Sequence, residues 1–114
     1  MAFKAARAAA PKGVKLFYND YKHASMTGVY QRKSDRVYDL VKNLTEAGCP
    51  IDGVGFQSHI AIDYDDEHYD SIRSNIQRYA ALNISVHFTE VDIRCNQTSA
   101  DACIYDTTWP DEAL

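Results

Sequence analysis

The chain has 114 residues, of which 46% are hydrophobic and 25% are charged, and its formal net charge is −4. This length leaves room for one small domain, and the composition is that of a globular protein rather than of a disordered tail. A net negative charge without a basic stripe argues against a nucleic-acid partner, and the lack of any apolar run near about 18 residues argues against a membrane-spanning segment.

Both ends of the sequence resemble interrupted helices. The first ten residues place apolar side chains and an arginine at helical spacing until Pro11 ends the pattern. The last residues look like a helix that is beginning, with Pro110 at its first position. A domain rarely begins with the end of a helix, so we expect this chain to be an excerpt of a larger domain.

Three strand-like runs alternate with two helical segments between these ends. The predicted strands are residues 14–19, 54–60 and 85–93, and the predicted helices are residues 34–47 and 66–82. Strands that alternate with helices form parallel sheets with right-handed crossovers, so the fold class is α/β. A flavodoxin-like sheet has the same alternation, but it usually carries a glycine-rich phosphate loop after the first strand, and none follows here.

Apolar spacing and capping residues set the expected helix faces and ends. Ser34 is a suitable N-cap for the first predicted helix, and Gly48 and Asn83 stand where left-handed residues terminate helices. Two stripes of apolar residues at helical spacing predict the buried faces. They are Val37, Leu40, Val41 and Leu44 in the first helix, and Ile72, Ile76 and Tyr79 in the second.

Each predicted strand ends with two polar residues in positions that share one face. These pairs are Asn19 and Tyr21, Gln57 and His59, and Glu90 and Asp92. A buried parallel strand normally reads as a nearly continuous apolar run, so polar residues at the same height of three strands are unusual. The carboxyl ends of parallel strands carry the chemistry of α/β folds, and we therefore expect a functional site there.

The remaining histidines do not form a recognisable metal motif. His23 is expected in a loop, His68 in solvent near the start of a helix, and His87 on the strand face opposite Glu90. No spacing matches a zinc site, so no metal is expected. A glutamate flanked by a histidine and a second acid suits a nucleophile that must stay ionised and aimed.

Four blocks of the sequence closely resemble glycoside hydrolase family 10, the endo-β-1,4-xylanases. They are Ala2-Phe-x-x-Ala-Arg-x-Ala-x-Pro11, Lys15-Leu-Phe-Tyr-Asn-Asp-Tyr21, Pro50-Ile-Asp-Gly-Val-Gly-Phe-Gln-Ser-His59 and Thr89-Glu-Val-Asp-Ile93. The tail from residue 94 onward is similar only through Trp109. The resemblance implies that residues 1–114 are a fragment of a single catalytic domain, a partial (β/α)8 TIM barrel that contains its fifth to seventh strands.

The resemblance also implies an activity and a set of roles. The activity is retaining hydrolysis of xylan without a cofactor, and Glu90 corresponds to the nucleophile that His59 and Asp92 orient. Gln57 corresponds to a member of the polar network, and Asn19 and Tyr21 to residues that line the sugar cleft. The family's general acid/base lies in a Trp-Asp-Val-x-Asn-Glu block on the fourth strand, and this chain contains no such block. The chain alone is therefore expected to be inactive.

Two rival functions remain open from the residues. One is a module that binds polysaccharide through aromatic side chains without cleaving it, and the other is a metal-dependent sugar isomerase or hydrolase on a similar barrel.

A polymeric substrate favours a secreted protein, and secretion suits a disulfide between Cys95 and Cys103 that leaves out Cys49. Three glycosylation-type triplets begin at Asn43, Asn83 and Asn96, and they carry little weight because such triplets arise by chance.

Overall fold

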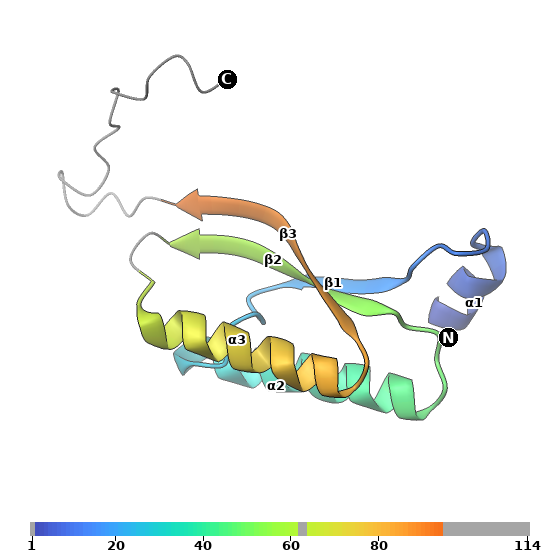
Figure 1. The fold of residues 1–114 in the computed structure, drawn as a ribbon, viewed down its shortest axis with the longest axis horizontal. Helices are drawn as coiled ribbons and strands as arrows, with labels where there is room; N and C mark the ends of the chain where they lie inside the picture. Colours follow the sequence, from blue (N-terminus) through green and yellow to red (C-terminus); the bar gives the residue numbers. More distant parts are fainter. Residues whose placement is uncertain (1, 62–63, 95–114) are drawn as a thin grey trace, which may run out of the picture.

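The computed structural model describes residues 2–61 and 64–94, which form one parallel sheet with helices on one side (Figure 1). The elements are α1 (Ala2–Ala9), β1 (Phe17–Tyr21), α2 (Gly28–Glu46), β2 (Gly53–Ala61), α3 (Asp66–Ala81) and β3 (Ser85–Arg94). The strands lie in the order β1-β2-β3, and α2 and α3 cover the same face of the sheet. The predicted alternation of parallel strands and helices is confirmed.

The first strand lies further along the chain than the sequence pattern predicts. β1 begins at Phe17 rather than at residue 14 and continues to Tyr21. The preceding backbone has other partners, because Val14 closes a turn with Pro11 and the N–H of Leu16 donates to the Asp52 carboxylate at 2.7 Å. Side-chain and turn hydrogen bonds therefore replace the expected ladder at this end of the strand.

Helix α2 begins before the predicted N-cap. Thr27 precedes its first turn, and Ser34 is fully buried inside the helix. The segment from Gly28 onward is polar, so no apolar stripe marks it as helical in the sequence. The predicted left-handed helix ends are confirmed, since Gly48 has φ 64° and Asn83 has φ 57°.

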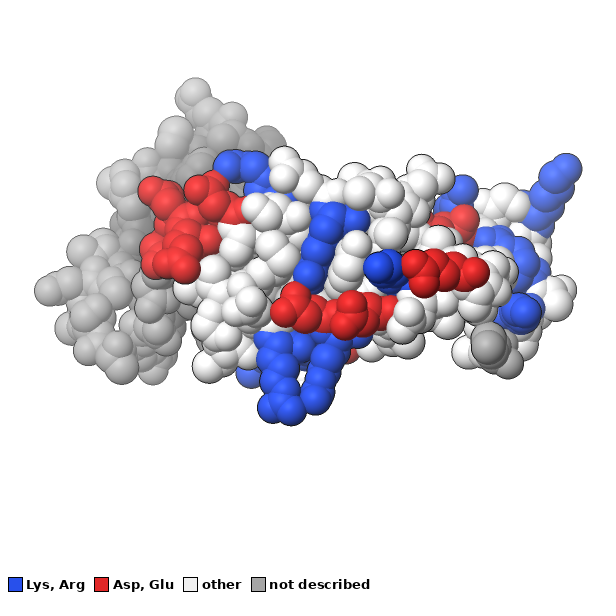
Figure 2. All heavy atoms as spheres, turned by 90° about the horizontal axis from the view of Figure 1, so that it is seen from below, with Lys and Arg blue, Asp and Glu red and all other residues white. Residues whose placement is uncertain are grey.

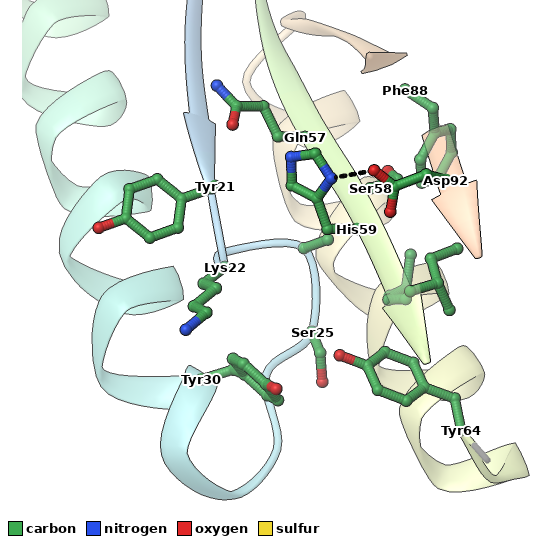
Figure 3. Close-up of a pocket in the computed structure, with 13 residues that line it drawn as sticks. Tyr21, Lys22, Ser25, Tyr30, Gln57, Ser58, His59, Tyr64, Phe88 and Asp92 are labelled. Carbon is green, nitrogen blue, oxygen red and sulfur yellow. Dashed lines mark hydrogen bonds and ion pairs between the residues drawn. The ribbon is translucent and has the colours of Figure 1, made fainter. Parts of the chain in front are cut away.

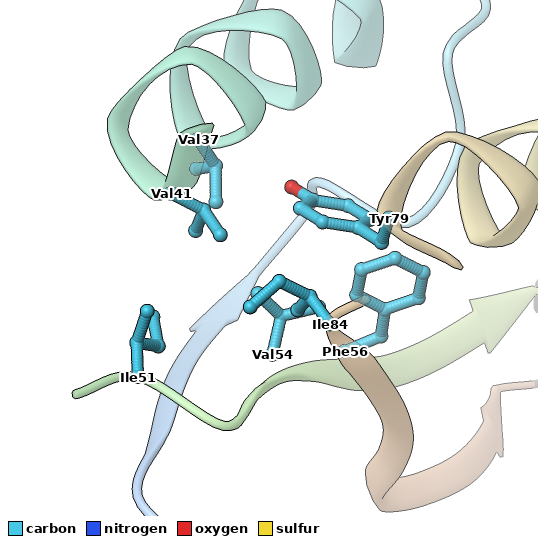
Figure 4. Packing of buried hydrophobic residues seen from close by; sticks show 7 residues of the cluster. All are labelled: Val37, Val41, Ile51, Val54, Phe56, Tyr79 and Ile84. Carbon is cyan, nitrogen blue, oxygen red and sulfur yellow. The ribbon is translucent and has the colours of Figure 1, made fainter. Parts of the chain in front are cut away.

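The hydrophobic core lies between the sheet and the two helices (Figure 4). Its members come from α2, α3, β2 and the segments that enter β2 and β3, namely Val37, Val41, Ile51, Val54, Phe56, Tyr79 and Ile84. Leu44 and Ile76 pack against this cluster as predicted, but Leu40 is 41% exposed. Leu40 lies at the margin of its stripe, where the helix surface turns away from the sheet.

The outward surface of the helices carries mixed charge. Lys and Arg side chains are interspersed with Asp and Glu on the face seen in Figure 2.

Within residues 2–61 and 64–94, no helix combines the length and the apolar character needed to cross a bilayer. Cys49 is buried, whereas Cys95, Cys103, Asn96 and Pro110 lie outside the described residues.

An ionic contact joins α1 to the amino-terminal end of the sheet and predicts a pH effect on stability. The N–H of Leu16, together with the guanidinium of Arg7, lowers the pKa of Asp52 below its usual value despite partial burial. A carboxyl group whose pKa is depressed by folding stabilises the fold above its unfolded pKa of about 3.9, and this contribution is lost as the pH falls through the lower folded value.

Replacing Asp52 with Asn should therefore lower the melting temperature of the full-length protein at pH 7. We expect a decrease of roughly 2–4 °C, which is about 1 kcal/mol for a domain of 150–250 residues, because the Asp52 pair is partly exposed and screened. Calorimetry should show that the difference from wild type shrinks as the pH falls below about 4. A difference that grows toward acid would contradict the sign of this effect.

Candidate functional site

A β-bulge in β3 determines which side chains reach the open face of the sheet, the face not covered by α2 and α3. Gln57 of β2 pairs with Thr89, whereas His59 pairs with Asp92, so one extra residue of β3 lies between these two pairs. Glu90 lies in this interval with φ 54°, in the left-handed region. The bulge brings Glu90 and Asp92 to the same face as His59.

The bulge corrects the prediction for His87. Its ring lies 4.3 Å from that of Phe17, between ring centroids, and therefore on the open face, the face to which Glu90 also belongs. Regular alternation would have put His87 and Glu90 on opposite faces, and the extra residue in β3 removes that separation. We therefore find the predicted separation of His87 from Glu90 to be wrong.

His59 lies between two carboxylates at the carboxyl end of the sheet, and Figure 3 shows its contact with one of them, Asp92. Its Nδ1 is 2.7 Å from Oδ2 of Asp92, and its Nε2 is 3.5 Å from Oε2 of Glu90. The three side chains are about half exposed, as expected for groups that meet a ligand from solvent. Donation from Nδ1 to Asp92 fixes the orientation of the ring, and this orientation directs Nε2 toward Glu90.

Asn19 reaches Glu90 from β1, on the other side of β2. Its Nδ2 lies 3.5 Å from Oε1 of Glu90, and its Oδ1 accepts a hydrogen bond of 2.8 Å from the Thr89 hydroxyl. To make these contacts the side chain crosses β2 directly over Gly55, where an added Cβ would lie 2.4 Å from Oδ1 of Asn19. The absence of a side chain at Gly55 therefore allows β1 to contact β3 across the intervening strand.

The crossing predicts a result for Gly55→Ala in the full-length protein. The added methyl group must displace the Asn19 amide, because no real Cβ approaches an oxygen this closely, while the β-strand backbone at this position tolerates alanine. We expect the kcat/KM of a reaction catalysed at this site to fall about tenfold to a hundredfold, the effect of misplacing a positioned polar group by about 1 Å. Steady-state kinetics would measure this loss. Gly48→Ala would serve as the control, because alanine at φ 64° strains an exposed helix end remote from the site and should lower stability without changing kcat/KM.

Tyr21 lies at the carboxyl end of β1 under a lysine ammonium. The Nζ of Lys33 is 3.6 Å from the centre of the Tyr21 ring and 2.9 Å from Oδ1 of Asp20. Burial alone would raise the pKa of Asp20, but hydrogen bonds from Lys33, the N–H of Tyr21 and the Tyr18 hydroxyl outweigh it and hold that pKa below its usual value. The ionised Asp20 thus places Lys33 over the aromatic ring.

A pocket of about 360 Å³ extends from the His59–Asp92 pair toward the segments that follow β1 and β2. It includes Tyr21 and Gln57, as the sequence predicts, together with side chains that sequence reasoning did not select (Figure 3). The additional polar and aromatic members are Lys22, Ser25, Tyr30, Ser58 and Tyr64. Most of these stand outside regular elements, where no periodic pattern distinguishes them.

The other two histidines have structural surroundings of their own. His23 is fully buried, with Nε2 3.2 Å from the carbonyl oxygen of Gly55, and burial lowers its pKa. His68 is less solvated than expected, because its ring stacks on Tyr64 and its Nδ1 lies 2.7 Å from Asp65. Among the described residues, no group of three His, Cys, Asp or Glu side chains is placed to hold a metal ion.

Comparisons with known proteins agree on one family. Residues 1–111 match the profile described as Glycosyl hydrolase family 10. The chain is 39% identical, over 104 residues, to the endo-1,4-beta-xylanase/feruloyl esterase of Xylanibacter ruminicola, and the match covers 91% of this chain and 13% of that protein. The chain therefore spans a small part of the length of this relative.

Two solved structures superpose on the same region. Xylanase 10B from Thermotoga petrophila in complex with xylobiose is 37% identical with a TM-score of 0.75, over 88% of this chain and 28% of that one. The intracellular xylanase from Thermoanaerobacterium saccharolyticum is 39% identical with a TM-score of 0.70, over 89% of this chain and 29% of that one. The three parallel strands and the two helices between them thus correspond to part of a (β/α)8 barrel.

Proposed function

The chain belongs to glycosyl hydrolase family 10, and from this premise we propose that the protein containing it is a retaining endo-1,4-β-xylanase with Glu90 as its nucleophile. The observation that carries the proposal is the contact of Glu90 with His59, which is itself bound to Asp92 at the carboxyl end of the sheet. A barrel of this kind places its active site at that end. Xylan or xylo-oligosaccharides are the proposed substrates.

Glu90 is proposed to attack the anomeric carbon of the sugar on the non-reducing side of the cleaved bond. The bond from that carbon to the leaving oxygen breaks, and an ester links the sugar to Glu90 until water hydrolyses it. His59 and Asn19 contact one oxygen each of the Glu90 carboxylate, so both restrict its rotation. A fixed, ionised carboxylate is what the displacement requires.

A second carboxyl group must protonate the leaving oxygen about 5–5.5 Å from the nucleophile. Asp92 is unsuited to this role, because it projects from the same strand and face as Glu90 and is bound to His59. We propose that a glutamate on the fourth strand of the barrel, in a block that this chain does not contain, supplies the proton, as the resemblance implies. Gln57, Tyr21 and Lys22 line the pocket beside the nucleophile and are proposed to contact the sugar chain.

The full-length protein incubated with xylotetraose tests the proposal. We expect β-configured products at first, detected by proton NMR before mutarotation, together with new reducing ends and no effect of EDTA. Binding without cleavage would favour the polysaccharide-binding module, and loss of activity with EDTA would favour the metal-dependent enzyme.

Secretion remains a prediction of the sequence, and secretion assays of the full-length protein would test it.

A further inference from the structure

The loop of residues 22–27, between β1 and α2, supplies one wall of the pocket through Lys22, Ala24 and Ser25. We propose that Asn75, a buried residue of α3, is a positioning residue that holds this loop in the shape required to bind the sugar chain. The inference rests on the proposed function. In this inference α3 shapes the wall of the pocket, a role that the polar residues at the strand ends do not have.

Asn75 binds the backbone of the loop directly. Its side chain is fully buried, and its Nδ2 donates to the carbonyl oxygens of His23 at 2.8 Å and Ala24 at 2.6 Å. Its Oδ1 accepts a hydrogen bond of 2.7 Å from Nε of Arg78. Arg78 offers only donors, so this bond settles which end of the amide faces the loop.

Ser34 of α2 completes the contact from the other helix. Its hydroxyl donates to the carbonyl of His23 at 2.9 Å and accepts a hydrogen bond of 2.8 Å from Nη2 of Arg78. The Nη1 of Arg78 pairs with Asp35 at 2.8 Å. Asn75 of α3 and Ser34 of α2 therefore bind two consecutive carbonyls of the loop, and Arg78 binds both of these side chains. An unpaired buried carbonyl is costly, so the loop is stable only in a shape that presents these oxygens to Asn75 and Ser34.

A second anchor holds the other half of the loop. The hydroxyl of Ser71 lies 2.8 Å from that of Ser25 and accepts a hydrogen bond of 3.1 Å from the N–H of Met26. Ser71 and Asn75 are four residues apart and thus occupy one face of α3. At the start of the loop, Lys22 has φ 55°, a left-handed conformation that a lysine keeps only where its surroundings impose it.

The loop is also connected to the strand beside the nucleophile. The imidazole of His23, whose carbonyl Asn75 holds, packs edge-on against Phe56 and lies 3.2 Å from the carbonyl of Gly55. Gly55 is the residue over which Asn19 crosses to Glu90. An apolar side chain at position 75 could fill the same space, but it would leave the loop carbonyls unpaired. The polar network is therefore best explained by the loop shape that its hydrogen bonds impose.

The test compares Asn75→Asp with Val41→Ala in the full-length protein. The aspartate keeps the shape of Asn75 but turns an acceptor toward two carbonyls, whereas Val41→Ala removes buried methyl groups from the apolar core. For Asn75→Asp we expect KM for xylotetraose to rise about tenfold with kcat changed less than about threefold, because the His59–Glu90–Asp92 contacts are untouched. Hydrogen exchange measured by mass spectrometry should show faster exchange in residues 22–27.

Val41→Ala should lower the melting temperature while leaving KM and the exchange of the loop at their wild-type values. The inference is overturned if Asn75→Asp leaves either KM or loop exchange unchanged, or if Val41→Ala changes both to the same extent. Should Asn75→Asp fail to fold, Ser34→Ala takes its place, with an expected rise in KM of about threefold. Failure of the wild type to cleave xylotetraose would instead contradict the proposed function, and the exchange data alone would then decide whether Asn75 holds the loop.

Discussion

Replacing Glu90 with Gln in the full-length protein is expected to lower kcat on xylan by about 10⁴-fold or more, while KM changes little. An amide has the size of the carboxylate but cannot form the glycosyl ester, and removal of a nucleophile costs this much in other enzymes. The contacts of Glu90 with His59 and Asn19 are near hydrogen-bond length and tolerate an amide. Reducing-sugar assays over a range of xylan concentrations would separate the two constants.

Two further measurements make this expectation specific. Glu46→Gln, on the exposed surface of α2 beside Lys42, removes the same charge far from the sheet and should keep wild-type kcat. A 2-fluoro-xylobioside with a good leaving group should label the wild type once per molecule, at Glu90, because the fluorine slows hydrolysis of the ester. A label on Asp92, or unchanged turnover in Glu90→Gln, would contradict the assignment.

Periodicity predicts the order of the elements but not the bulge that completes the site. The three strands and two long helices follow from apolar spacing and from Gly48 and Asn83, and all are present. Strict alternation paired with the observed register would put Glu90 opposite Ser58, on the helix-covered face. The polar residues at the strand ends predict correctly that His59 and Glu90 lie together. The bulge that places them there is not predicted, because an extra residue in a strand has no periodic signature.

Buried polar residues were the other part that sequence reasoning could not recover. Ser34 suits an N-cap by composition, yet its hydroxyl serves a loop carbonyl from inside a longer helix. Asn75 lies within the predicted apolar stripe of Ile72, Ile76 and Tyr79 but forms no motif, and its partners are backbone atoms of a loop 51 and 52 residues away. A backbone carbonyl can accept a hydrogen bond whatever the type of its residue. The sequence therefore does not mark such acceptors, and only the three-dimensional arrangement identifies these hydrogen bonds.

A polypeptide made of these 114 residues alone is expected to unfold without a cooperative transition. Within residues 2–61 and 64–94 the sheet has the order β1-β2-β3, so β1 and β3 each pair with a described strand on one side only. Apolar side chains are exposed along β3, where Phe88, Val91 and Ile93 are 50%, 61% and 68% accessible. Unpaired edges next to exposed apolar residues favour association over a stable monomer. Differential scanning calorimetry and light scattering would show a broad transition and aggregation.

The same polypeptide is expected to release no reducing sugar from xylan. If the general acid lies in a part of the barrel that this chain does not contain, as proposed, the leaving oxygen would depart without its proton even where Glu90, His59 and Asp92 keep their contacts. General acid catalysis typically contributes about 10²–10⁴-fold. A fluorogenic xylobioside with an acidic leaving group needs little protonation, so residual turnover of this substrate but not of xylan would isolate the missing acid as the cause. Turnover of xylan at the rate of the full-length protein, together with a sharp melting transition, would contradict both expectations, because it would require a monomer with two open edges to supply every group that the reaction needs.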